Sequence, residues 1–354
     1  RSIFRLTVPT GGGKTIASLA FALNHAVKHH MDRIIYVVPY ISVIEQNAEV
    51  FREILGNENV LENHSNVDYE DSEELRPMQL ASENWDKPIV VTTNVQFFES
   101  LFSNKSSKCR KIHNITNSVI ILDEAQMLPM DYLIPCTAML QELVQNYKTS
   151  IVLCTATQPS LDNFFGQIEN FVELCPRMEE QFEFFRRVTY QNIGNISKEN
   201  MAERLKKEQR ALCIVNTRKR AQELYQLLKS EGVYHLSTTM YPKHRKKVLA
   251  NVKERLDNKD RCILIATSLV EAGVDLDFLS VYRQIAGIDS LIQAAGRCNR
   301  NGNESTEESK VYIYDFEDSK VIPSQQKKID VTKSVVQDYE DISDLECKIG
   351  RAHV

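Results

Sequence analysis

The chain has 354 residues, of which 42% are hydrophobic and 26% charged, and its formal net charge is −5. These values are typical of soluble globular proteins, and the length predicts two domains. The negative charge excludes a uniformly basic coat for nucleic acid, so any such binding needs a local groove. The eight cysteines form no C-x-x-C pair, and no apolar stretch approaches the roughly 20 residues of a membrane span. We therefore expect reduced cysteines, a cytoplasmic location and no membrane attachment.

In the first half of the chain, short β-branched runs alternate with helical patterns. This alternation predicts βαβ units and a mostly parallel sheet with helices on both faces. The predicted strands are Ile3–Val8, Arg33–Val38, Pro88–Thr92, Ser118–Leu122 and Ile151–Cys154, and the predicted helices are Ile16–Ala26, Ser42–Leu55 and Leu133–Gln145.

After Pro176 the pattern lapses, and the acidic, aromatic stretch Arg177–Phe185 indicates the crossing to a second domain. Strands are then predicted at Ala211–Val215, Tyr234–Ser237, Cys262–Ala266, Val281–Ile285 and Val311–Tyr314, and helices at Thr217–Ser230 and Lys243–Asp257. We therefore predict an α/β fold of two tandem domains, 1–176 and 177–318, with a peripheral tail at 319–354.

The two ends of the sequence suggest a fragment of a longer protein. The chain begins at Arg1 rather than at a methionine, directly before the first predicted strand. Its last residues, Ile349–Val354 (IGRAHV), resemble a translated sequencing adapter. We expect these last residues to carry no information about the fold.

A phosphate-binding loop is predicted at Pro9–Thr15, PTGGGKT, between an apolar strand and a helical run. Glycines let backbone N–H groups close on phosphate oxygens, and the following helix adds its positive end. Lys14 supplies a charge for the β- and γ-phosphates of ATP, and Thr15 supplies a hydroxyl for Mg²⁺. The alternative is an incidental glycine-rich turn. The residues assigned to the nucleotide are Thr10, Gly11, Gly12, Gly13, Lys14 and Thr15.

A second predicted strand ends in two acids within Val119–Gln126, VIILDEAQ. Ligands of an open α/β sheet bind at the carboxyl ends of its strands. Asp123 can therefore hold Mg²⁺ opposite Thr15, and Glu124 is placed to orient and deprotonate the attacking water. The alternative is a pair of solvated acids at a strand end.

The next strand ends in TAT, Thr155–Thr157. Small hydroxyl residues at this point can bond Gln126 and relay the state of the nucleotide. An ordinary turn at a strand end is the alternative.

In the second half, Leu291–Gly302 reads LIQAAGRCNRNG. Gln293, Arg297 and Arg300 are spaced i, i+4 and i+7, which predicts one shared helical face. Two guanidinium groups and an amide projecting together suit a γ-phosphate, as an arginine finger supplied within the chain. A solvated basic face is the alternative.

The segment Thr267–Asp275, TSLVEAGVD, precedes those arginines. Gly273 allows a close backbone approach to a ligand. Asp275 can bond a ribose hydroxyl or an arginine, and Thr267 can contact a phosphodiester.

Taken in order, PTGGGKT, VVPYISVIEQN, VTTNVQFFESLF, LDEAQ, TAT, IVNTRKRA, ATSLVEAGVD and QAAGRCNRNG resemble the motifs of superfamily 2 helicases. LDEAQMLP, VTTNVQFFESLF and CTATQP are similar in particular to the helicase part of the CRISPR-associated helicase-nucleases of type I interference systems. The resemblance implies two RecA-like domains with ATP hydrolysis in the cleft between them. It also implies 3′-to-5′ travel along single-stranded DNA and recruitment to a guide-RNA surveillance complex.

The resemblance also implies a set of nucleic-acid contacts, mostly neutral hydroxyls and amides that suit phosphate contacts without sequence readout. The matched positions are Pro39, Gln46, Thr92, Thr93, Asn94, Gln96, Asn216, Thr217, Arg218 and Thr267.

Two features depart from the family pattern. The family usually carries an HD nuclease, but the eight histidines here form no convincing ligand set. We expect that domain outside this chain. The acidic motif Leu122–Gln126, LDEAQ, ends in Gln126, where relatives often have a histidine or an aspartate. Two alternative functions stay open: an RNA or DNA-repair helicase with the same motifs, and a nucleotide-gated nucleic-acid-binding module with weak hydrolysis.

Overall fold

The computed structural model describes residues 2–64, 76–156, 161–165, 171–271, 273–319 and 325–338. Thr157 and the adapter-like segment 349–354 lie outside these ranges. The chain divides into two compact units, Arg1–Gln181 and Phe182–Val354.

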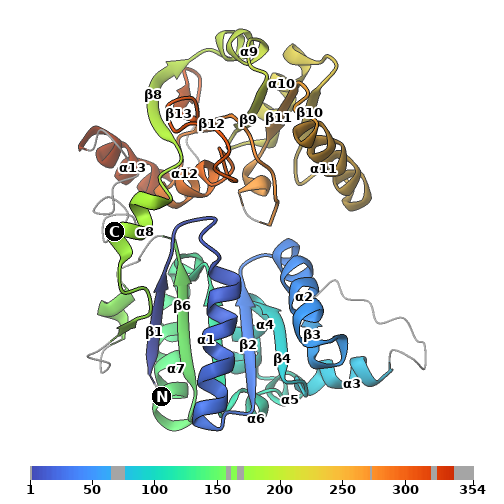
Figure 1. The fold of residues 1–354 in the computed structure, drawn as a ribbon, viewed down its shortest axis with the longest axis vertical. Helices are drawn as coiled ribbons and strands as arrows, with labels where there is room; N and C mark the ends of the chain where they lie inside the picture. The colour runs from blue at the N-terminus through green and yellow to red at the C-terminus, as the bar shows by residue number, and fades with distance from the viewer. Residues whose placement is uncertain are drawn as a thin grey trace. The chain divides into compact units, whose positions relative to one another are not determined.

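The first unit is built on a seven-stranded sheet in the order β3-β4-β2-β5-β6-β1-β7. Figure 1 labels five of these strands, β3, β4, β2, β6 and β1. Every neighbouring pair is parallel. The strands are β1 (Ile3–Thr7), β2 (Arg33–Val38), β3 (Val60–Asn63), β4 (Ile89–Thr93), β5 (Ser118–Asp123), β6 (Ser150–Thr155) and β7 (Val172–Glu173). Sequence patterns missed β3 and β7, which are short.

Helices follow the strands of this unit in nearly strict alternation. They are α1 (Lys14–His29), α2 (Ile41–Leu55), α3 (Arg76–Asn84), α4 (Asn94–Phe102), α5 (Ser106–Cys109), α6 (Ile112–Ile115), α7 (Leu133–Asn146) and, at the boundary between the units, α8 (Met178–Phe184).

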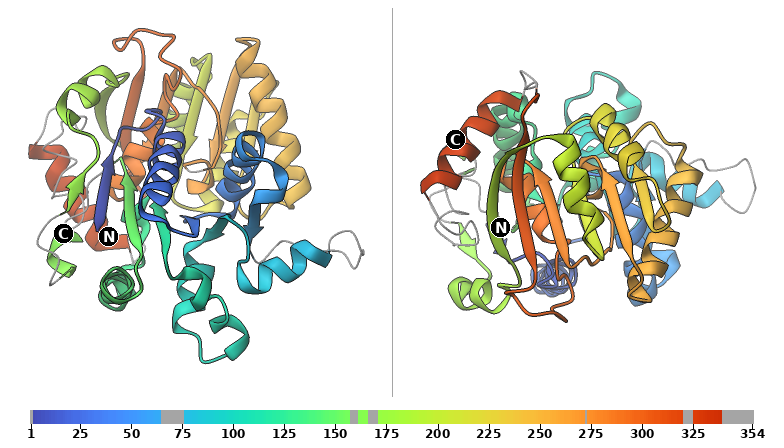
Figure 2. Two further views of the ribbon diagram at one scale, coloured as in Figure 1. Left: turned by 60° about the horizontal axis from the view of Figure 1, so that its bottom comes forward. Right: turned by 90° about the horizontal axis from the view of Figure 1, so that it is seen from above.

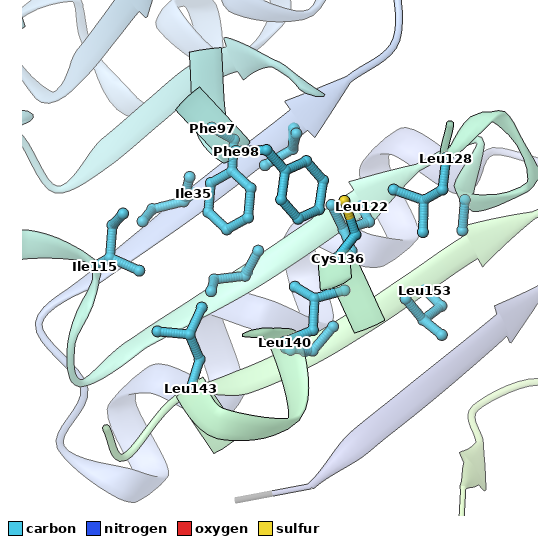
Figure 3. Packing of buried hydrophobic residues seen from close by; sticks show 14 of the residues in the cluster. Ile35, Phe97, Phe98, Ile115, Leu122, Leu128, Cys136, Leu140, Leu143 and Leu153 are labelled. Carbon is cyan, nitrogen blue, oxygen red and sulfur yellow. The ribbon is translucent and has the colours of Figure 1, made fainter. Parts of the chain in front are cut away.

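Two apolar cores lie on opposite faces of the sheet. In β2, Ile35 and Val37 belong to one core, whereas Ile34, Tyr36 and Val38 belong to the other. Successive strand residues point to opposite faces, so a strand buried on both sides needs an unbroken apolar run. Helices α4 and α7 cover the first core, part of which is shown in Figure 3, and α1 and α2 cover the second.

The second unit has a six-stranded sheet in the order β10-β11-β9-β12-β13-β8. Its strands are β8 (Thr189–Ile196), β9 (Arg210–Ile214), β10 (Val233–Leu236), β11 (Cys262–Ala266), β12 (Ser280–Gln284) and β13 (Lys310–Phe316). Its helices are α9 (Lys198–Lys206), α10 (Arg218–Leu228), α11 (Pro242–Asp257), α12 (Ile288–Ala295) and α13 (Gln326–Asp338). Helices flank this sheet on both faces, as two further views show (Figure 2).

The two sheets share one strand order. In each unit the strands, counted along the chain, lie in the order third, fourth, second, fifth, sixth and first, and β7 extends the first sheet at its edge. The predicted pair of parallel α/β domains is therefore confirmed. Helix α13 buries Ile329 and Val335 against α12. The exact domain bounds and the peripheral tail at 319–354 stay predictions.

The strand order of the first unit explains how its motifs meet. Strands β5, β6 and β1 are adjacent and parallel, with Thr7 beside Thr155 and Asp123 beside Cys154. The segments that follow β1, β5 and β6 are far apart in the sequence, but they all leave the sheet at the carboxyl ends of these strands.

One histidine of α1 is built into the core. His25 is 9% exposed, its Nε2 lies 2.9 Å from Ser150 Oγ, and its ring packs against Phe4 and Phe21. Burial, reinforced by nearby positive charge on His29, lowers the pKa of His25 from 6.5 to about 4.

This lowered pKa predicts a loss of stability in acid. Between pH 6.5 and about 4 the unfolded chain binds a proton at His25 that the folded chain does not, so stability falls as the pH falls. The variant His25→Gln should show a shallower fall in its urea midpoint between pH 7 and pH 5. Exposed His113→Gln is the control. A wild-type slope in His25→Gln would contradict the assignment.

Candidate nucleotide and nucleic-acid sites

The predicted phosphate loop joins β1 to α1. Thr10, Gly11, Gly12 and Gly13 form the loop, and the Gly12 N–H donates to the carbonyl of Pro9 at 3.0 Å. Gly11 and Gly13 have φ angles of 84° and 76°, in the left-handed region that disfavours other residues. A Cβ on Gly13 would meet no atom within 4 Å, so the glycine is needed for its backbone angle rather than for space.

Helix α1 begins at Lys14 with an open positive end. Among the described residues, no side chain caps this end, and its first turn holds no acid. Thr15 lies in that first turn. The unpaired N–H groups and the helix dipole make such an end suitable for a phosphate.

Lys14 lies beside the two acids, Asp123 and Glu124, at the carboxyl ends of β1 and β5. Lys14 Nζ lies 2.9 Å from Glu124 Oε1, and the two side chains are 10% and 24% exposed. Burial by itself lowers the pKa of Lys14, but the charges of Glu124 and Asp123 outweigh it and the pKa is raised. Lys14 is therefore a positively charged group that its ion pair with Glu124 holds in place at the carboxyl ends of the strands.

Asp123 is buried beside the same lysine. The Tyr36 hydroxyl donates to its Oδ2 at 3.2 Å, and the Glu124 N–H donates to its Oδ1 at 3.0 Å. Burial and then the neighbouring Glu124 charge raise the pKa of Asp123 to about 6, against the opposing effect of Lys14. A carboxylate held in this way is a suitable ligand for a hard cation such as Mg²⁺.

Glu124 has a strained backbone. Its φ angle of 49° places a non-glycine residue in the left-handed region. Such a conformation costs about 1–3 kcal/mol and persists only where the surroundings enforce it. Here it turns the chain sharply after β5, and the side chain reaches Lys14.

A hydrogen-bonded line continues from Glu124 to the end of β6. Gln126 Nε2 donates to Glu124 Oε2 at 2.5 Å, and Thr155 Oγ1 donates to Gln126 Oε1 at 2.7 Å. The Val8 N–H donates to the carbonyl of Thr155 at 3.1 Å, which ties this strand end to the phosphate loop. The predicted contact between Thr155 and Gln126 is thus present, while a coupling role for Thr155 and Thr157 stays a prediction.

In the second unit, the structure separates the two candidate arginines. Helix α12 ends at Ala295, so the expectation that Gln293, Arg297 and Arg300 share one helical face is wrong. Gly296 stops the helix, and Cys298 then forms a strand-like bridge with Phe278.

Arg297 is 6% exposed and is bonded to main chain. Its Nε donates to the carbonyl of Val270 at 3.0 Å, and its Nη2 donates to the carbonyl of Glu271 at 2.7 Å. Arg300 instead pairs with Asp275 at 2.7 Å, in a contact where the side chains are 26% and 55% exposed. The sequence left two partners open for Asp275, a ribose hydroxyl or an arginine. The structure shows the arginine, Arg300.

Both halves of the chain match known families. The DEAD/DEAH box helicase family matches residues 3–164, and the C-terminal family of the CRISPR-associated nuclease/helicase Cas3 matches residues 207–303. A CRISPR-associated nuclease/helicase Cas3 from Haloferax volcanii is 26% identical over an alignment covering 94% of this chain and 48% of that protein. The chain is therefore similar along nearly its whole length to CRISPR-associated Cas3 proteins. The predicted resemblance to CRISPR-associated helicase-nucleases and the predicted helicase class are confirmed.

Solved structures share the fold. T. fusca Cas3 has a TM-score of 0.75 at 16% identity, covering 95% of this chain and 48% of that one. T. fusca Cas3 with ATP has a TM-score of 0.71 at 18% identity, covering 90% and 44%. A chain of a CRISPR RNA-guided surveillance complex, pre-nicking, has a TM-score of 0.68 at 17% identity, covering 95% and 46%. The chain spans about half the length of the curated relatives it matches.

The candidate nucleic-acid contacts fall into two groups. In the first group, the side chains already make local bonds. The Thr92 hydroxyl is fully buried and donates to the carbonyl of Asn63, and Thr93 caps α4 by accepting from the Gln96 N–H. Thr217 caps α10 in the same way, and both ends of the Asn216 amide are bonded.

The second group consists of exposed or half-buried side chains and of buried polar atoms without a partner. Pro39 is half-buried after β2, and Gln46 and Arg218 are exposed. Asn94 Oδ1 and Thr267 Oγ1 are buried and have no hydrogen-bond partner within the described part of the chain. Buried polar atoms normally find a partner, so these two atoms are the strongest of the predicted contacts.

Sequence reasoning missed several residues of these sites. Tyr36 holds Asp123, but its place there follows only from the adjacency of β2 and β5. Glu271 is the single acid between Thr267 and Gly273, so the sequence alone could have drawn attention to it. The sequence does not indicate which residue it contacts. No group of three potential metal ligands occurs among the described His, Cys, Asp and Glu side chains. No described helix is both long and apolar enough for a membrane crossing.

The two arginines should differ in their effect on stability. Arg297→Ala removes the donors of two buried carbonyls, and each unsatisfied group costs about 1–3 kcal/mol of unfolding free energy. Arg300→Ala breaks a partly exposed pair worth about 0–1 kcal/mol. Urea unfolding of both variants gives the comparison. Equal losses would show that the Arg297 bonds contribute no more than a surface ion pair. The role of both residues as arginine fingers stays a prediction.

Proposed function

We propose that this chain is an ATP-driven motor that moves 3′-to-5′ along single-stranded DNA as the helicase part of a Cas3 protein. The observation that carries the proposal is the line of contacts from Lys14 through Glu124 and Gln126 to Thr155. It joins the phosphate loop to two further strand ends, so a change at one part reaches the others through short, directional bonds.

The residues present fit Mg²⁺-ATP. The open end of α1 and Lys14 suit the phosphates, and Thr15 with the buried Asp123 carboxylate suit the cation. When bound, this group supplies the phosphoryl group that is transferred to water. Glu124 orients that water and accepts its proton, and Lys14 neutralises phosphate charge.

The polar line also suits a relay. Gln126 is a neutral amide that donates to Glu124 and accepts from Thr155 at the same time. It therefore reports the position of Glu124 to the end of β6 without a titrating group. Thr155 is the next member of that relay.

We also propose partners and a setting for the chain. Matched proteins include a nuclease/helicase and a chain of a CRISPR RNA-guided surveillance complex. These names support recruitment to such a complex and an HD nuclease domain outside this chain. The described cysteines are all free thiols, which suits the reducing cytoplasm.

Lys14→Ala should abolish ATP turnover and keep the fold, because Lys14 acts by charge rather than by packing. Glu124→Gln should keep ATP affinity and lose about 10²–10⁴-fold in turnover, the usual contribution of a general base. Lys28→Ala on the same helix and Glu142→Gln on α7, both exposed, are the matched controls. Steady-state ATPase and nucleotide affinity are measured separately for each variant. Normal turnover in Lys14→Ala would show that PTGGGKT is not the nucleotide site.

The choice of polymer tests the DNA motor directly. ATP turnover should rise with a single-stranded DNA oligonucleotide and respond little to RNA of equal length. Displacement of a block from the 5′ end, but not from the 3′ end, would support the direction of travel. Equal stimulation by both polymers would favour an RNA helicase, and none by either would favour a nucleotide-gated binding module.

A further inference from the structure

Helix α11 begins with a cluster of positive charge. Tyr241–Lys247 reads YPKHRKK, and residues 232–253 contain no acid, although the chain as a whole has a net charge of −5. Among the residues that the structure describes, no side chain caps the start of α11, and its first turn holds no acid. The lysines, the arginine and the open end of the helix therefore add up to a positive field that no acid in the flanking sequence offsets.

The lysines of this cluster face away from the core. Lys243, Lys246 and Lys247 are exposed and spaced i, i+3 and i+4, so they share one face of α11. The opposite face carries Val248 and Val252, which are buried in the core of the second unit. Because helical side chains lean toward the start of their helix, the three lysines extend toward the end of α11 that follows β10.

The start of α11 lies at the same edge of the sheet as the predicted nucleic-acid contacts of this unit. Strands β10, β11 and β9 are adjacent and parallel, and their last residues, Leu236, Ala266 and Ile214, lie in one row. The Thr267 N–H donates to the carbonyl of Leu236 at 3.2 Å, so the segments after β10 and β11 stay together beyond the strands. Only the turn 237–240 separates β10 from α11, which Figure 1 labels beside that strand.

Two further features of this edge suit a nucleic-acid strand. Tyr241, directly before the lysines, is 74% exposed. Thr267 Oγ1 is buried and has no hydrogen-bond partner within the described part of the chain. An exposed aromatic ring can stack a base, and lysines and hydroxyls can contact phosphates without reading sequence. An acidic protein surface would use the lysines but would need neither the ring nor the hydroxyl.

We propose that Tyr241 and the first two turns of α11 form a binding surface for single-stranded DNA, which lengthens the row of contacts predicted at Thr217 and Thr267. This inference rests on the proposed function and adds a surface to it. The lysines hold phosphates, and Tyr241 stacks one base. All of these residues belong to the second unit, so the surface binds DNA without nucleotide.

The first test is the salt dependence of DNA binding by the full chain. The double variant Lys243→Gln with Lys247→Gln removes two exposed charges and leaves the core face of α11 intact. The Kd for a labelled oligothymidylate is measured by fluorescence anisotropy, without nucleotide, over a series of salt concentrations. Each phosphate contact of a single strand contributes about 0.7 to the slope of log affinity against log salt, so the double variant should lower that slope by about 1.4. Its affinity at low salt should fall as well.

The matched control is Lys253→Gln with Lys259→Gln. Both lysines are exposed, lie toward or just beyond the far end of α11, and carry the same total charge. This control should keep the wild-type slope. An equal fall in both double variants would overturn the inference, because it would show an effect of net charge alone. A wild-type slope in the Lys243 and Lys247 variant would also overturn it and would point to an acidic protein as the partner of the cluster.

The second test concerns the ring of Tyr241. A single 2-aminopurine, whose fluorescence is quenched by stacking, is moved stepwise along the oligothymidylate. At one position it should be quenched by the wild type and by Tyr241→Phe but not by Tyr241→Ala, whose affinity should be about tenfold weaker. Equal fluorescence with all three proteins at every position would overturn the assignment of Tyr241. A wild-type chain that does not bind the oligothymidylate at all would overturn the proposed function itself.

Discussion

The polar site of the first unit depends on how Lys14, Asp123 and Glu124 lie together in a nearly buried position at the carboxyl ends of the strands. Lys14 and Glu124 form an ion pair, and Asp123 lies beside them with a pKa raised to about 6. Two carboxylates against one ammonium leave the edge with an excess of negative charge, which favours a cation. This constraint also gives a reason for Gln126. An acid or a charged imidazole would alter that balance, whereas an amide bonds Glu124 and Thr155 without adding charge.

The sheet makes this arrangement possible by placing distant segments at adjacent positions. Asp123 and Thr155 end neighbouring strands, and the strand before the phosphate loop lies next to Thr155. Strands β5 and β6 are buried along their whole length on both faces. A slip in their register would therefore move whole sets of apolar residues as well as the polar ends. The rigid packing of the two cores therefore fixes the polar contacts to within hydrogen-bond distances.

The sequence predicted well where local pattern and chemistry agree. The glycines of the phosphate loop and the acids after an apolar strand can each be recognised from a few consecutive residues. The structure places these two motifs together. The arginine segment shows the limit. Spacing of i, i+4 and i+7 favours a continuous helix, but Gly296 ends it and a bridge between Phe278 and Cys298 redirects the chain. The partners of Arg297 lie far upstream, so its burial could not be read from its neighbours.

The second unit uses arginine in two physically different ways. Arg283 and Arg297 are both buried. Arg283 spreads its rigid fork of donors over Asn216, Glu271 and Ser290, which lie on three different segments. Arg297 donates to the adjacent carbonyls of Val270 and Glu271. Arg300 is partly exposed and pairs with a more exposed acid, Asp275. A lysine could replace the charge in either case, but it could not hold three segments at fixed angles. Buried polar contacts of this kind add little to stability and much to geometry. Between them, Arg283 and Arg297 fix Glu271 by its side chain and by its backbone, so the position of this one residue is set from two directions.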